Sequence, residues 1–249
     1  MKAGKERWLA PQKVAGAVAR RRLFCIPFAG GGSLAFHGWS RDLPRDLEVC
    51  SVMLPGRESR LSDPPIARLS ELVPALADGL APHLDLPFTL FGHSVGALIA
   101  FELVRELRRR GARQPAHLFA SAFRAPSRAN PNPALHALAE PELIEELRGY
   151  GGIPEPVLAS RELLDLFLPT IRADFALHET YVHREEPPLD TPLTVFGGTR
   201  DTKVRPEHLE GWQSQTRARF RQELFDGDHF FLKPCREQLF AVVVEELGR

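Results

Sequence analysis

The sequence predicts an α/β protein whose mainly parallel, doubly wound sheet is interrupted by a helical insertion. Three observations carry this prediction. Short apolar runs alternate with longer amphipathic stretches, glycine or proline follows several of the runs, and one proline-rich segment breaks the alternation. A chain of 249 residues, 43% of them hydrophobic, can bury a sizeable core, so a single domain is expected.

The predicted strands are apolar runs too short to be helices. The first is closed by the glycine cluster at residues 30–32, and the second by Pro55 and Gly56. The strands are expected at residues 23–27, 49–54, 88–91, 117–122, 193–196 and 220–225. Residues 1–22 are expected to form a loose polar leader, which leaves residues 23–249 as the folded domain.

Three stretches between or after these strands are expected to be helices. Leucine and valine recur at helical spacing over residues 69–84. Residues 95–110 are rich in Ala, Leu and Ile and end in three arginines before Gly111, which is a helix stop signal. A closing helix is expected over residues 237–247.

The segment 126–190 departs from this rhythm because it has many prolines and no convincing strand. Pro141 stands at a helix-compatible first position for a helix over residues 140–148. Ser160 can cap a second helix from Arg161, which Pro169 should kink or divide before Tyr181. We interpret the segment as a lid over the sheet; the alternative is a pair of ordinary crossover helices.

Gly92-His93-Ser94-Val95-Gly96 matches the G-x-S-x-G pattern of a nucleophile elbow. There the serine stands on a strained turn between a strand and a helix, and the glycines remove side chains that would clash. The bare pattern is short enough to arise by chance, but here a predicted strand precedes it and a predicted helix follows. The sequence therefore predicts the α/β-hydrolase fold with Ser94 as nucleophile. His93 occupies a variable position of the motif and is interpreted as a packing residue.

A serine nucleophile needs a histidine base and a carboxylate that orients the base, in the chain order serine, acid, histidine. His229 is the predicted base because it lies on the loop after the strand at residues 220–225. Asp201 is the predicted acid because it follows the strand at residues 193–196 and the turn after it. Asp228 is too close to His229 to orient its ring easily, and Asp226 and Asp174 remain minor rivals.

Acyl transfer also needs backbone N–H donors for the developing oxyanion. Val95, directly after the nucleophile, supplies the first. We assign the second to Ala29, on the loop after the first strand, because Pro27 has no N–H. The alternative for residues 30–32 is a simple turn. No phosphate-loop, dinucleotide or metal-ligand motif is present, so no cofactor and no metal is expected.

Composition narrows the remaining possibilities. Thirty-two basic and thirty-two acidic side chains cancel, so neither a nucleic acid nor a membrane partner is expected. Cys25, Cys50 and Cys235 are too few and too scattered for a disulfide framework and are expected to be buried thiols. No apolar run approaches the eighteen or more residues of a membrane span, and the N-terminal apolar stretch is too short for a signal peptide. A soluble, cytoplasmic protein is expected.

With these residues laid out, the chain resembles the type II thioesterases, discrete hydrolases that accompany modular polyketide and nonribosomal peptide synthases. The similarity runs from about Leu23 to the C-terminus. It is carried by Pro27-Phe28-Ala29-Gly30-Gly31, Leu54-Pro55-Gly56-Arg57-Glu58, Gly92-His93-Ser94-Val95-Gly96, Arg172-Ala173-Asp174, Phe196-Gly197-Gly198 and Gly227-Asp228-His229-Phe230-Phe231.

The resemblance implies that the serine attacks an acyl thioester on the phosphopantetheine arm of a carrier protein, and that water then releases the acid. The implied role is editing of stalled or mis-primed carriers, with Arg172 in the lid that shapes the acyl chamber. The chain departs from the family pattern at Phe28, where histidine is frequent, and at Thr199-Arg200, where acidic residues are frequent. These departures leave the contacts near the entrance open.

Two other functions remain open on the sequence. An acyltransferase would use the same triad and oxyanion donors to pass the acyl group to a second thiol or amine. A non-catalytic binding protein could keep the scaffold without its chemistry. A general carboxylesterase is disfavoured because the early loop is not of the H-G-G-G type. The expected partners are acyl-loaded carrier proteins, and the expected oligomeric state is a monomer.

Overall fold

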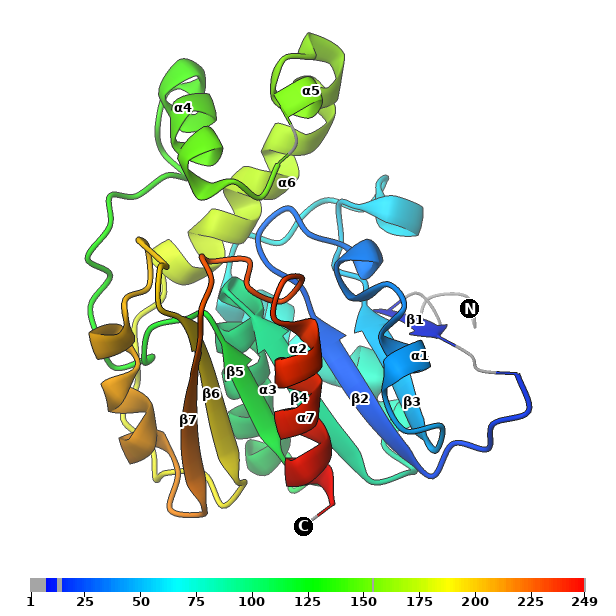
Figure 1. Ribbon diagram of the computed structural model, residues 1–249. Coiled ribbons are helices and arrows are strands. Elements are labelled where there is room, and N and C mark those ends of the chain that lie inside the picture. Colours follow the sequence, from blue (N-terminus) through cyan, green and yellow to red (C-terminus); the bar gives the residue numbers. More distant parts are fainter. Residues whose placement is uncertain (1–7, 13–14, 154, 249) are drawn as a thin grey trace.

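The computed structural model describes residues 8–12, 15–153 and 155–248. Its centre is a seven-stranded sheet in the order β1-β3-β2-β4-β5-β6-β7 (Figure 1). Strand β1 runs antiparallel to β3, and the other neighbouring strands are parallel. The strands are β1 Leu9–Gln12, β2 Arg21–Ile26, β3 Leu47–Val52, β4 Phe88–His93, β5 Leu118–Ser121, β6 Leu193–Gly198 and β7 Phe220–Phe225.

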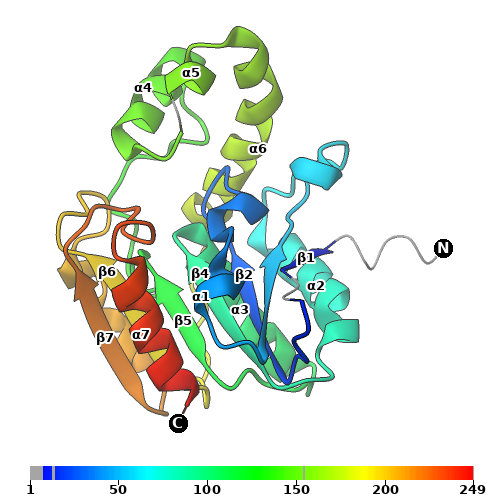
Figure 2. The same cartoon turned by 45° about the vertical axis from the view of Figure 1, so that its right-hand side comes forward.

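Helices cover both faces of the sheet. Figure 2 shows α1 and α7 in front of the strands and α2 and α3 behind them. The helices are α1 Trp39–Asp42, α2 Leu69–Leu80, α3 Val95–Arg109, α4 Glu140–Tyr150, α5 Glu155–Leu158, α6 Arg161–Glu179 and α7 Arg236–Leu247. Short 3₁₀ turns lie at Ser33–Phe36, Glu58–Arg60, Ala81–His83, Pro206–His208 and Glu210–Gln215.

The central strands are buried on both faces, as their nearly continuous apolar sequences require. One apolar cluster packs α2 and α3 against the sheet, with Leu72 and Leu103 among its fully buried members. A second packs α1 and α7 against the opposite face, around Trp39, Phe91 and Phe240. The predicted strands are confirmed, and their ends differ from the prediction by no more than two residues.

The N-terminal segment differs from its prediction. Residues 1–22 were expected to be a loose leader, yet β1 pairs with β3 and Trp8 is buried. A Cβ on Gly79 of α2 would lie 2.3 Å from the Trp8 ring, so the indole rests directly on that glycine. The expectation is therefore wrong for residues 8–12 and for Arg21 and Arg22, the first two residues of β2. Strand β1 is short and contains Pro11, which is tolerated because β1 lies at the edge of the sheet. Residues 1–7, 13 and 14 lie outside the described residues.

The helical insertion, residues 126–190, carries α4, α5 and α6 and no strand among its described residues. Figures 1 and 2 show α4 and α5 standing above the edge of the sheet where the parallel strands end. Ser160 caps α6 as predicted, with its hydroxyl accepting from the N–H of Leu163 at 3.4 Å. Pro169 was expected to kink or divide this helix; it does not divide it, because α6 runs unbroken from Arg161 to Glu179. Leu164 before the proline and Ile171 after it pack into one apolar cluster.

The three cysteines are buried and free, as predicted. Burial raises the pKa of the Cys25 thiol well above its usual range and that of Cys50 to about 12. Both therefore remain thiols at neutral pH. No helix among the described residues has the length and apolar character to cross a bilayer.

Candidate active site

Ser94 stands on the turn between β4 and α3 in a conformation that few residues adopt. Its backbone has φ 55° and ψ −128°, which is strained for a residue with a side chain. A Cβ on Gly92 would lie 2.1 Å from the carbonyl oxygen of Gly96, and a Cβ on Gly96 would lie 2.2 Å from that of Ile26. Only glycine fits at either position, so the turn has the geometry that the G-x-S-x-G pattern predicts.

Two side chains from later loops meet the serine. The His229 ring, on the loop after β7, has Nε2 3.1 Å from Ser94 Oγ. Its Nδ1 lies 2.7 Å from Asp201 Oδ2, on the loop after β6. Both His229 and Asp201 are buried. The structure thus joins the three residues named from the sequence into one hydrogen-bonded chain at the carboxyl edge of the sheet.

Both oxygens of the Asp201 carboxylate accept hydrogen bonds. Its second oxygen, Oδ1, accepts from the N–H groups of Lys203 at 2.8 Å and Val204 at 2.9 Å. Burial by itself would raise the pKa of Asp201. The hydrogen bond and charge of His229, together with the two backbone donors, outweigh burial and hold the pKa below its usual range. The carboxylate is therefore ionised at neutral pH and fixed in orientation.

The rival carboxylates are engaged elsewhere. Asp226 is exposed and pairs with Arg200, and Asp228 accepts from the N–H of Phe230 at 2.8 Å. Asp174 is buried against Arg57, with 2.7 Å between Oδ1 and Nη2. None of the three has a recorded contact with His229 among the described residues.

His93 is a packing residue in its surroundings, as the sequence interpretation held. Its Nδ1 lies 2.9 Å from Ser121 Oγ, and its ring meets the rings of Phe28 and Phe230. Burial, followed by the neighbouring His229, holds the pKa of His93 well below its usual value, so the ring is neutral. Its ring packs beside that of His229, with 5.5 Å between the ring centroids.

The loop after β2 carries Ala29, the predicted second oxyanion donor. Among the described residues, no acceptor is recorded for the Ala29 N–H. The next N–H, that of Gly30, donates to Asp174 Oδ2 at 2.7 Å, and Arg57 Nη1 donates to the carbonyl of Gly31 at 2.7 Å. Val95, the other predicted donor, is the first residue of α3, where an N–H has no partner within the helix.

The Arg57–Asp174 pair was not recognised from the sequence. Arg57 and Asp174 each lie in a motif that carries the family resemblance. They are 117 positions apart in the sequence, so no short sequence motif indicates that they are paired. Glu58 bonds instead to the N–H and hydroxyl of Ser33, each at 2.8 Å. Arg57 and Glu58 therefore brace the loop that carries Ala29 from two sides.

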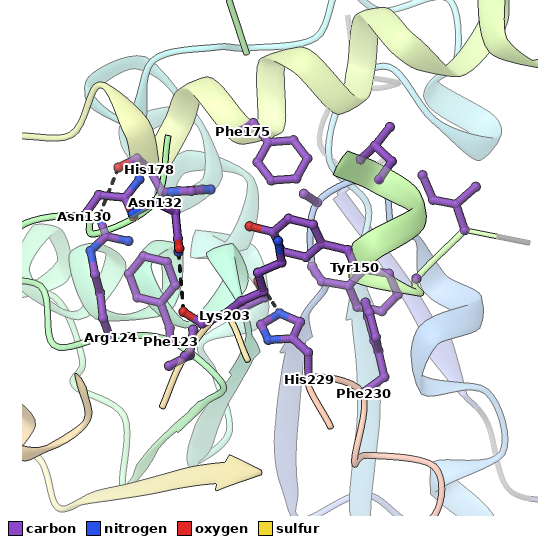
Figure 3. Close-up of a pocket in the computed structure, with 17 residues that line it drawn as sticks. Phe123, Arg124, Asn130, Asn132, Tyr150, Phe175, His178, Lys203, His229 and Phe230 are labelled. Atoms are coloured by element: carbon purple, nitrogen blue, oxygen red, sulfur yellow. Dashed lines mark hydrogen bonds between the residues drawn. The ribbon is translucent and has the colours of Figure 1, made fainter. Parts of the chain in front are cut away.

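A pocket opens beside Ser94 and His229 beneath the helical insertion (Figure 3). Its volume is about 50 Å³; one water needs roughly 10–15 Å³, so the pocket is narrow. It is lined by Phe28, Ala29, Ser94, Phe123, Arg124, Asn130, Asn132, Leu147, Tyr150, Gly152, Ile153, Phe175, His178, Lys203, Val204, His229 and Phe230. Most of these were not predicted, because tertiary packing brings them together from separate segments; eight of the seventeen come from the insertion. Among the described residues, no group of three or more His, Cys, Asp or Glu side chains could hold a metal ion.

Comparisons with known proteins agree with this site. The model of the thioesterase domain family matches residues 21–246. Gramicidin S biosynthesis protein GrsT of Aneurinibacillus migulanus is 39% identical over 241 residues, which cover 97% of this chain and 94% of that protein. Both proteins therefore align over nearly their whole length.

Solved structures show the same similarity. RedJ, a thioesterase from the prodiginine pathway of Streptomyces coelicolor, has a TM-score of 0.86 and 39% identity, covering 94% of this chain and 91% of that one. YbtT, a type II thioesterase from the yersiniabactin pathway, has a TM-score of 0.86 and 31% identity, covering 97% and 98%. The α/β-hydrolase fold predicted from the sequence is confirmed.

Proposed function

The chain belongs to the thioesterase domain family, and from this premise we propose that it releases acyl groups from the phosphopantetheine arms of carrier proteins. The carriers belong to a modular polyketide or nonribosomal peptide synthase, and hydrolysis clears those that are stalled or mis-primed. The relatives support this role, since YbtT is a type II thioesterase from a biosynthetic pathway that contains both kinds of synthase. The enzyme is a hydrolase that acts on thioesters.

The observation that carries the proposal is the hydrogen-bonded chain from Ser94 through His229 to Asp201, with spacings of 3.1 and 2.7 Å. His229 takes the proton of Ser94 as Oγ attacks the thioester carbonyl, and Asp201 holds the imidazole ring in the required tautomer. The N–H groups of Ala29 and Val95 stabilise the oxyanion. The C–S bond then breaks, His229 gives its proton to the departing sulfur, and the carrier leaves as its free thiol. Ser94 Oγ stays bonded to the acyl carbon as an acyl-serine, and His229 is neutral again.

Water then completes the reaction. His229 removes a proton from the water, whose oxygen attacks the acyl-serine, and the same two N–H groups hold the second oxyanion. The protonated His229 returns its proton to Ser94 Oγ as the free acid leaves. The helical insertion acts as a lid that closes the pocket during this sequence. The protein acts as a monomer, and its mass in solution, measured by sedimentation velocity, tests this. It acts in the cytoplasm together with the synthase.

The test is deacylation of a loaded carrier protein, followed by intact mass. Wild-type protein should release the acyl group, and the Ser94→Ala variant should be slower by a factor of about 10⁶. Circular dichroism of both proteins checks that the fold is intact. If both leave the carrier loaded while wild type alone cleaves a small ester, the nucleophile stands and the carrier-editing role is wrong.

A further inference from the structure

The pocket beside Ser94 has two chemically different ends. Near His229 its walls are largely aromatic, since the His229 ring meets those of Tyr150 and Phe230, and Phe28 packs against Phe230. Figure 3 shows four polar side chains gathered on the other side of the pocket: Arg124, Asn130, Asn132 and His178. An acyl group with a purely alkyl chain could not form a hydrogen bond with any of these four side chains.

Arg124 is the unusual member of this group. Only 9% of its surface is exposed, and among the described residues no carboxylate lies within ion-pair distance of it. Its Nε donates to the carbonyl of Arg128 at 3.2 Å and its Nη2 to that of His178 at 3.3 Å. The guanidinium lies 4.8 Å from the centre of the Phe123 ring. The charge of Glu179 attracts the guanidinium, but that carboxylate accepts from the N–H groups of Leu135 and His136, and burial outweighs the attraction and lowers the pKa of Arg124. Burial of a cation without a carboxylate in contact is costly, and arginine stays protonated under ordinary conditions.

His178 adds a second unused polar group at the same end. Its Nδ1 is buried without a hydrogen-bond partner in the described part of the chain. Burial, followed by the charge of Arg124, lowers the pKa of His178 to about 3, so the ring is neutral and can bond to an uncharged or anionic ligand. Lys203, by contrast, is engaged: its Nζ lies 3.3 Å from Glu146 and over the Tyr150 ring.

We infer that this polar end binds an oxygen acceptor at the far end of the acyl group, with Arg124 as the main donor. The acyl groups favoured would carry a carbonyl or carboxylate remote from the thioester, and apolar acyl groups of the same shape would be poorer substrates. This inference rests on the proposed function, because the thioester must lie at Ser94 for the far end to reach Arg124. The ligand supplies a further acceptor to the guanidinium, beyond the carbonyls of Arg128 and His178.

The experiment compares three acyl groups of nearly the same shape on the carrier protein and on N-acetylcysteamine. They are 5-methylhexanoyl, 5-oxohexanoyl and glutaryl, which differ only in the groups at the far end; a second set is one methylene longer. Uncatalysed loss is measured with Ser94→Ala and subtracted. Wild type should show a kcat/KM roughly ten- to hundredfold higher for an acceptor-bearing group than for the methyl-branched one. The two acceptor-bearing arms distinguish a carbonyl from a carboxylate.

Arg124→Gln should lower that preference by a similar factor. Arg128→Gln is the matched control, because Arg128 is exposed and is not part of the pocket lining. The control should keep the wild-type preference, and thermal unfolding of both variants checks the fold. A uniform loss for all three acyl groups in Arg124→Gln would assign the guanidinium to the pantetheine arm and overturn the inference.

The remaining outcomes separate this inference from the proposed function. If wild type shows no preference on either thiol, the inference is wrong while hydrolysis of carriers stands. If the preference appears with N-acetylcysteamine thioesters but no carrier is deacylated, the acceptor site stands and the carrier-editing function fails. If wild type hydrolyses none of the thioesters, both are wrong.

Discussion

Two regions of the molecule meet at the pocket, and they are held in different ways. The sheet edge, made of the loops after β4, β6 and β7, is fixed by short hydrogen bonds: the Asp201 carboxylate alone accepts three. The helical insertion is held largely by an apolar cluster of its own, around Leu143, Leu147 and Phe175. The chemistry proposed for Ser94 depends on small differences in interatomic distance, whereas a pocket wall can change shape without losing its stability.

Polar contacts join the insertion to the rest of the protein at several points, among them Lys203 with Glu146 of α4 and a group near the base of α6. Asp174, on α6, binds the N–H of Gly30 and the guanidinium of Arg57. Thr170, one turn earlier, donates to the carbonyl of Gly56 at 2.7 Å. The insertion is therefore coupled to the loop of Ala29 near the base of α6, while α4 and α5 stand away from the sheet (Figure 2). This arrangement predicts that substitutions in the two regions will have different consequences.

The largest expected effect lies at the sheet edge. Asp201→Asn should lower kcat by about 10⁴, because the amide no longer holds His229 in the required tautomer. The free energy of unfolding should change far less than this factor implies. Steady-state hydrolysis of a thioester and urea unfolding measure the two quantities separately.

Asp226→Asn is the matched control for this comparison. Asp226 lies on the same loop as His229, but it is exposed and pairs with Arg200. Its removal should change kcat by less than about twofold, since exposed ion pairs contribute little. Equal losses in the two variants would mean that Asp201 has no special role.

The site could be predicted from the sequence where its chemistry is tied to local backbone geometry. Ser94 is identified by the two glycines around it, and His229 and Asp201 each follow a recognisable strand. The pocket could not be predicted in this way. Arg124, Tyr150 and His178 come from three separate segments and line one cavity only through tertiary packing.

The fold shows the same limit. Short, nearly continuous apolar runs predicted six strands, because burial on both faces leaves a clear pattern. Strand β1 has four residues and contains Pro11, so neither length nor alternation indicated it. Strand β1 is identified by its tertiary contacts. It pairs in register with Val49–Val52 of β3, and the preceding residue, Trp8, packs its ring against Gly79.

Loss of the Arg57–Asp174 ion pair between the two regions should have the second largest effect, mainly on stability. Arg57→Leu leaves the Asp174 carboxylate buried without its partner, so the free energy of unfolding should fall by about 3–5 kcal/mol. The kcat should also fall, because the loop of Ala29 loses its support. Urea unfolding and thioester hydrolysis test both statements.

Replacing both partners distinguishes the effect of the unpaired charge from the effect of lost side-chain packing. Arg57→Leu combined with Asp174→Leu should recover part of the lost stability, since no unpaired charge remains. Arg200→Leu, at the exposed pair with Asp226, should cost less than about 1 kcal/mol. If Arg57→Leu costs no more than Arg200→Leu, the buried pair does not join the two regions.

Large-to-small substitutions in the two apolar clusters should show most clearly whether the two regions unfold independently. Leu143 of α4 and Leu103 of α3 are each fully buried, and replacement by alanine should cost about 2–5 kcal/mol at either site. In Leu143→Ala the loss should appear as faster amide exchange confined to α4 and its neighbours, with fluorophosphonate labelling of Ser94 retained. In Leu103→Ala protection should fall across the sheet.

The outcome decides how far the insertion behaves as its own unit. Local loss in one variant and general loss in the other would match the separate clusters. If Leu143→Ala also lowers protection throughout the sheet, the insertion and the sheet unfold together, and the contrast between the regions is one of function alone.

The smallest expected effect concerns His178, which lies in the insertion against Arg124. Burial, followed by the charge of Arg124, lowers the pKa of His178 from 6.5 to about 3. Between these values the unfolded chain binds a proton and the folded chain does not, so stability is lost as pH falls. The slope for one such group is about 1.4 kcal/mol per pH unit. His178→Gln lacks the group, so its unfolding free energy should fall less steeply with acidification than that of wild type.

Urea unfolding at pH 7, 6 and 5 measures this difference in slope. His37→Gln is the control, because His37 is exposed and its replacement should leave the wild-type slope. Parallel curves for wild type and His178→Gln would mean that His178 is protonated in the folded protein. In that case the polar end of the pocket carries two cations rather than one, which would favour a carboxylate over a neutral carbonyl as its ligand.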